Sequence, residues 1–154
     1  MIHKKLDYEH IDLRLIAFFK RIFIPSARIA IFIIFFWFGF LKLIGLSPAD
    51  SLALALTEQT VGLQYFDVLF ILLSLMECLI GVLFLIPKMT RIVVPLLLIH
   101  MIMVCSPLLL LPSIVWQAPF VPTLEGQYII KNAVIVAVAI GIAASTPPLV
   151  HKSK

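Results

Sequence analysis

The sequence predicts an all-α integral membrane protein, with four transmembrane helices in an antiparallel bundle and a short amphipathic helix before them at the membrane interface. Of the 154 residues, 62% are hydrophobic and 13% are charged, and the mean hydropathy is +1.15. Soluble domains carry about 45–50% apolar and about 25% charged residues, so this chain could not hide its apolar surface from water. The apolar residues gather in four long runs, and the basic residues fall almost entirely on one side of these runs.

The composition excludes an ordinary soluble enzyme, a disordered regulator and a disulfide-stapled secreted domain. Cys78 and Cys105 both lie inside apolar runs and form no CxxC pair, so we expect free thiols that pack as small hydrophobic side chains. The formal net charge of +4 does not form a basic stripe, so no nucleic-acid partner is expected. The chain also lacks a cluster of ligands with metal-binding spacing.

Four runs are long enough to cross a bilayer, whose apolar core needs about 20 helical residues. These spans cover residues 27–46, 67–86, 92–111 and 128–145. They belong to a single domain, residues 1–154, because no linker or second domain interrupts the pattern. Gly45 and Pro48 end the first span, and Pro87 with Lys88 ends the second. We expect Pro25 in the first turn of the first span, where proline is tolerated.

The positions of lysine and arginine predict the orientation. Ten of the twelve lie in residues 1–28, in the turn between the second and third spans, or in the tail. The connections 47–66 and 112–127 contain none. The positive-inside rule therefore places both termini in the cytoplasm, with the lipid bilayer as the first partner of the chain.

Residues 13–24 are predicted to form an amphipathic helix at the cytoplasmic interface. Arg14, Arg21 and Arg28 recur every seven residues and so share one helix face, with phenylalanine and isoleucine elsewhere. Such a face is attracted to anionic lipid headgroups. The alternative is a cleavable signal peptide, but the apolar run that follows is too long and offers no small-residue cleavage site before its end.

Small residues predict how the helices approach one another, because close backbone contact drives helix association in lipid. Ser74 and Gly81 mark one face of the second span. Ala133, Ala137 and Gly141 place a small residue at every fourth position of the fourth span. These strips fit packing within the bundle or self-association of the chain, and the pattern does not separate the two.

Four ionisable residues lie within the spans: Lys42, Glu77, His100 and Lys131. Such groups are costly in hydrocarbon and normally face a bundle interior or a wet cavity. Glu77 and His100 fall near the midplane, whereas Lys42 and Lys131 lie about 9–10 Å toward the outer face, at a rise of about 1.5 Å per residue. All four can therefore line one cavity that opens outward. The polar set continues outward through Asn132 and Gln127.

This arrangement suits proton transfer and anion binding. An acid and a histidine can relay protons, while two lysines hold an anion or polarise a carbonyl. A quinone headgroup, a small oxyanion or a lipid phosphate would each fit. Structural alternatives stay open, because Lys42 and Lys131 can snorkel to headgroups, and Glu77 and His100 can serve as hydrogen-bonded core residues.

Three segments resemble DoxX-like membrane proteins: FFWFGFLKLIGLSPADS (35–51), LMECLIGVLFLIP (75–87) and PTLEGQYIIKNAVIVAVA (122–139). With the spacing of the spans, the resemblance covers about residues 25–146. It implies a four-helix protein of the bacterial inner membrane. Lys42, Glu77, Gly81, Lys131 and Asn132 match the recurrent polar or glycine positions of the family, and His100 matches less securely.

Some DoxX-like proteins are subunits of thiosulfate:quinone oxidoreductase, and others are associated with oxidative or chlorine stress. The resemblance therefore implies a redox- or stress-associated subunit that binds quinone or a small oxidised species, with a partner redox protein. If the chain is catalytic, it is part of a quinone-linked oxidoreductase. The alternatives are a small transporter or lipid-binding protein, and a non-catalytic structural subunit of a membrane complex.

Overall fold

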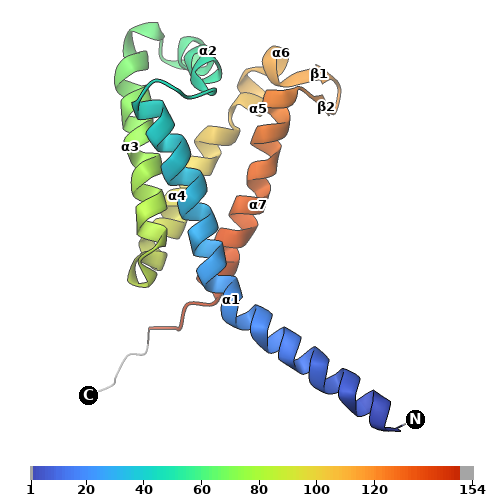
Figure 1. Cartoon of the computed structure of the whole chain (residues 1–154). Coiled ribbons are helices and arrows are strands. Elements are labelled where there is room, and N and C mark those ends of the chain that lie inside the picture. The colour runs from blue at the N-terminus through green and yellow to red at the C-terminus, as the bar shows by residue number, and fades with distance from the viewer. Residues whose placement is uncertain (1, 150–154) are drawn as a thin grey trace.

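The computed structural model describes residues 2–149, with side chains described from residue 10 onward. Helices make up most of this part of the chain, and one short hairpin interrupts them (Figure 1). The longer helices are α1 (Ile2–Leu43), α2 (Asp50–Thr60), α3 (Phe66–Phe84), α4 (Thr90–Cys105) and α7 (Leu124–Ala144). The shorter elements are η1 (Leu63–Tyr65), η2 (Pro87–Met89), α5 (Pro107–Leu110), α6 (Pro112–Val115), β1 (Trp116–Ala118) and β2 (Val121–Pro122).

Four helical segments in the described residues are long and apolar enough to cross a membrane, which confirms the predicted number of spans. They are His10–Leu43, Leu63–Phe84, Pro87–Leu110 and Leu124–Ala144. The fourth helix begins earlier than expected, because Thr123 caps it: the Thr123 hydroxyl accepts a hydrogen bond from the Gly126 N–H at 3.2 Å. The chain is therefore an α-helical protein with the composition of a membrane protein.

Helix α1 differs most from the expectation for its region. A separate interfacial helix and a new start at Pro25 were predicted, but α1 is continuous and Pro25 lies in its interior. Proline in a helix interior removes one backbone hydrogen bond and favours a bend. The Ser26 hydroxyl donates to the carbonyl oxygens of Ile22 at 2.6 Å and Phe23 at 3.1 Å. Before this point α1 extends away from the other helices (Figure 1).

The end of α1 follows the prediction that Gly45 stops the first span. Gly45 has φ of 69°, a conformation that glycine adopts without a steric penalty. Its N–H donates to the Lys42 carbonyl at 3.2 Å, and the Leu46 N–H donates to the Leu41 carbonyl at 2.9 Å. These two bonds form a Schellman motif, which places Lys42 in the last turn of α1.

The core lies where α1 packs against α3 and where α4 packs against α7. Its buried side chains come from all four of these helices, so the helices share one apolar interior. The largest fully buried members include Ile31, Ile80, Phe84, Leu97 and Ile142. Most large apolar side chains outside this core are exposed, as expected for helices that face lipid.

Two elements at the end of the molecule opposite the start of α1 were not predicted. Helix α2 lies in the connection 47–66, and the antiparallel hairpin β1–β2 lies in the connection 112–127 (Figure 1). The hairpin pairs Trp116 with Pro122, and the Thr123 N–H donates to the Val115 carbonyl at 2.9 Å. At Gly126 an added Cβ would collide with that same carbonyl oxygen, so glycine lets α7 begin directly beneath the hairpin.

Candidate functional site

Three ionisable side chains from three membrane-length helices meet in the interior. Lys42 on α1 donates from Nζ to Glu77 Oε2 on α3, at 2.5 Å. The other carboxylate oxygen, Oε1, lies 3.5 Å from His100 Nε2 on α4. The side chains of Lys42 and Glu77 are 9% and 10% exposed. Glu77 thus bridges a lysine and an imidazole, and we call these three residues the polar cluster.

Close contact between α1 and α3 brings Lys42 to Glu77. A Cβ added at Gly39 would lie 2.8 Å from the Ser74 carbonyl oxygen, and one added at Gly81 would lie 2.9 Å from the Phe36 nitrogen. Both distances are shorter than real Cβ contacts, so the two backbones touch because glycine stands at both positions. Lys42 follows Gly39 by three residues and Glu77 precedes Gly81 by four, so both side chains lie on the contacting faces.

His100 closes the cluster from α4. The residue is 2% exposed, and its ring meets the Phe35 ring edge to face with centroids 5.6 Å apart. His100 Nδ1 is buried and has no hydrogen-bond partner among the described residues. Buried polar atoms are nearly always paired, so this nitrogen has a free capacity to donate or accept that the described side chains do not use.

The arrangement can hold and move a proton. A carboxylate in contact with an ammonium and an imidazole can pass a proton between them, and the lysine supplies positive charge beside the acid. The same groups can donate hydrogen bonds to a carbonyl or hydroxyl oxygen of a bound molecule.

The structure does not bring Lys131 to the cluster. Lys131 is exposed on α7, and its Nζ lies 5.0 Å from the centroid of the Tyr128 ring, a cation–π contact. Gln127 is exposed and Asn132 is half-buried on the same helix. Of the four ionisable residues expected to share a cavity, Lys42, Glu77 and His100 are together and Lys131 is apart.

The small residues predicted to pack against neighbouring helices are buried on α3 but not on α7. Ser74 and Gly81 are buried against α1. Ala133 and Ala137 are exposed and Gly141 is half-buried, so this strip faces away from the core. Helix α7 instead buries Gly126, Ile129, Ala139 and Ile142.

Arg28 is a residue whose position the sequence prediction misplaced. It was expected beside headgroups with Arg14 and Arg21, yet it is 8% exposed. Its Nη1 donates to the Phe84 carbonyl at 2.9 Å and its Nη2 donates to Thr90 Oγ1 at 2.5 Å. The guanidinium therefore binds the C-terminal end of α3, where the helix dipole favours a cation, and also a threonine hydroxyl at the start of α4. The sequence signal for its burial was its position as a single arginine beside Ala27, at the start of an apolar run.

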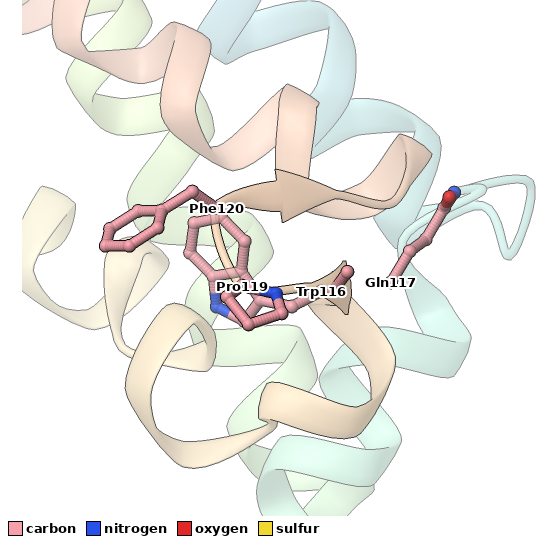
Figure 2. A pocket seen from close by; sticks show the side chains of 5 residues that line it. Trp116, Gln117, Pro119 and Phe120 are labelled. Carbon is pink, nitrogen blue, oxygen red and sulfur yellow. The ribbon is translucent and has the colours of Figure 1, made fainter.

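Two grooves lie away from the polar cluster. One, of about 380 Å³, follows the hairpin and is lined by Trp116 to Phe120 (Figure 2). Phe120 is 95% exposed and has φ of 62°, a strained conformation for this residue type. The other groove lies between α1 and α7. Within residues 10–149, no group of three or more histidine, cysteine or acidic residues could hold a metal ion, and both cysteines are free thiols.

No protein-family model, curated protein or solved structure matches this chain.

Proposed function

We propose that this protein is a DoxX-like subunit of the bacterial inner membrane that binds the headgroup of a quinone at Lys42, Glu77 and His100. The observation that carries the proposal is the meeting of these three side chains, from three different helices, around one carboxylate. A charged side chain inside an apolar span costs free energy. Ionisable groups inside a membrane therefore most often mark a ligand site or a proton pathway.

The donor set fits a quinone. Its ring carries two carbonyl oxygens that accept hydrogen bonds, and it takes up two protons when it is reduced by two electrons. Lys42 Nζ can donate to one oxygen, and the unpaired Nδ1 of His100 supplies further hydrogen-bonding capacity. Glu77, in contact with both residues, holds or releases a proton, while the electrons come from or go to a partner redox protein.

The edge-to-face contact between Phe35 and His100 supports this binding mode. It fixes the plane of the imidazole, so that proton exchange would occur at one defined position. The buried ring of Phe35 beside His100 offers an apolar surface that suits the hydrocarbon part of a lipid-soluble molecule.

We also propose that the four spans form an antiparallel bundle with both termini in the cytoplasm and that residues 13–24 lie at the cytoplasmic interface. The exposed basic residues Lys20, Arg21, Lys88 and Arg91 support this orientation, because they lie in the first half of α1 and at the turn between α3 and α4. Reporter fusions in the connections 47–66 and 112–127 should then show periplasmic activity. Cytoplasmic reporter activity at either site would refute the orientation.

The proposed function is tested by extracting the protein in mild detergent and measuring co-purified quinone by mass spectrometry. Wild type should carry quinone near one molecule per chain, and Glu77→Gln should lose most of it while keeping its helical circular dichroism. Lys131→Gln is the matched control, because Lys131 is an exposed lysine that lies apart from the cluster. Bulk phospholipid alone, unchanged in Glu77→Gln, would refute quinone binding.

A structural subunit is the second candidate, and one observation favours it. Lys42 and Glu77 satisfy each other at 2.5 Å, and neither groove includes the polar cluster. In this case Lys42 and Glu77 variants would lose thermal stability, with no ligand response. A small transporter remains the third candidate, and solute flux into proteoliposomes without any reductant would favour it.

A further inference from the structure

An open groove lies between the first half of α1 and the last turns of α7. Its volume is about 540 Å³, within the range of about 300–1,000 Å³ that ligand sites occupy. Phe19 and Phe23 form an apolar wall on α1, and Lys20 lies on the same stretch of helix. Gly141 on α7 and Ser145, which directly follows α7, line the opposite side. The groove is thus apolar along its walls and carries one exposed cation.

Gly141 keeps this groove open. A Cβ added there would meet only the Phe23 ring, at 3.6 Å, which is an ordinary van der Waals distance. Glycine is therefore not required for helix contact at this position, unlike Gly39 and Gly81, where an added Cβ would meet backbone atoms. A longer side chain at 141 would extend from the surface of α7 into the groove.

The groove has a polar end and an apolar end along the direction of the helices. Helix α1 passes from Lys20 through Phe23 toward the core, while α7 runs the opposite way and reaches Ser145 after Gly141. Lys20 and Ser145 therefore lie toward the basic end of the molecule, and Phe23 and Gly141 lie toward its apolar middle. A lipid with a charged headgroup and a hydrocarbon chain has the same polarity along its length.

We propose that this groove binds one anionic phospholipid, with an acyl chain along Phe23 and Gly141 and the phosphate beside Lys20. The charge of Lys20 complements a lipid that carries net negative charge, and it does not favour a zwitterionic lipid to the same degree. The bound lipid fills the space where α1 diverges from α7, so it would stabilise the direction in which α1 leaves the other helices.

The test is native mass spectrometry of the full-length protein, released from detergent after titration with palmitoyl-oleoyl phosphatidylglycerol or phosphatidylcholine. Wild type should bind one phosphatidylglycerol about fivefold more tightly than phosphatidylcholine, the preference expected for one basic residue near a phosphate. Lys20→Gln should remove this preference. Gly141→Leu should weaken the binding of both lipids. Lys88→Gln, a change at an exposed lysine outside the groove, should leave lipid binding unchanged.

Equal affinity of wild type for the two lipids would overturn the proposal, as would a Lys20→Gln variant that keeps the preference. A dimer that dissociates in Gly141→Leu, with no lipid bound to wild type, would assign the groove to contact between two copies instead. Lys20 is exposed, so its substitution should not affect folding, and a melting curve of each variant checks this. Quinone content should not change in Lys20→Gln, which separates this proposal from the polar cluster.

Discussion

Removing Lys42 alone should destabilise the protein more than removing Lys42 and Glu77 together. At 2.5 Å the ion pair has a Coulomb attraction of about 7 kcal/mol for an effective dielectric constant near 20. Desolvation of two ions costs several kcal/mol each and offsets most of this gain. Lys42→Met leaves the Glu77 carboxylate buried with only His100 nearby, and such a loss costs about 3–5 kcal/mol.

The double variant Lys42→Met/Glu77→Met replaces both charges with apolar side chains of similar length. Its free energy of unfolding should lie within about 1 kcal/mol of the wild-type value, because neither charge is left unpaired. Wild type, Lys42→Met, Glu77→Met and the double variant form a double-mutant cycle, and the unfolding of each in mixed micelles is followed by circular dichroism. The coupling energy between the two substitutions should exceed about 2 kcal/mol. Additive effects of the two single substitutions would refute the ion pair between Lys42 and Glu77.

Three further substitutions, two of them paired with a control substitution, test other features of the structure through the midpoint of thermal unfolding in detergent. Arg28→Met should lower the free energy of unfolding by about 2–3 kcal/mol, because the last carbonyl of α3 loses a charged donor. Arg21→Met, at an exposed position, should change it by less than about 0.5 kcal/mol. Gly81→Ala should cost about 1–3 kcal/mol, since its Cβ meets the backbone of α1, and Gly141→Ala should be close to neutral; equal effects would contradict the close approach of α1 and α3. Phe120→Gly should raise stability by about 1 kcal/mol by relieving the positive φ, and a loss would show that the exposed ring contributes a contact.

Hydropathy alone predicted the four long helices, since spans of about 20 apolar residues have few alternative structures. The stop at Gly45 was also predictable, because a glycine after an apolar run signals a C-cap. The connections were harder. Helix α2 and the β1–β2 hairpin are short and lie outside the spans, and their form depends on the helix ends beneath them. Pro25 was a misleading signal, because proline occurs in the interior of membrane-spanning helices more often than in helices of soluble proteins.

The candidate site was predicted in part. Lys42, Glu77 and His100 stood out because charged groups in apolar spans are rare and costly. Which of them would meet depends on the register between helices, and Gly39 and Gly81 set that register through contacts far apart in the sequence. Depth alone placed Lys131 with the others, but depth carries no information about which side of α7 faces the core.

The same limitation explains the small-residue strip of α7. Ala133 and Ala137 follow a helical period, yet the buried face passes through Ile129, Ala139 and Ile142. In hydrocarbon, apolar and small residues fit both lipid and protein neighbours, so a periodic pattern does not determine the buried face. The positions of α4, α1 and α6, which pack against α7, determine this face.

The contact between Lys42 and Glu77 is the basis of the polar cluster and of the function proposed for it. Solid-state NMR of the protein in lipid bilayers, with ¹⁵N-labelled lysine and ¹³C-labelled glutamate, measures the coupling between Nζ and the carboxyl carbon. The structure predicts one strong correlation in wild type, lost in Lys42→Met and kept in Lys131→Gln. A Lys42 Nζ that correlates with lipid phosphate and not with Glu77 would contradict the polar cluster and the function proposed for it.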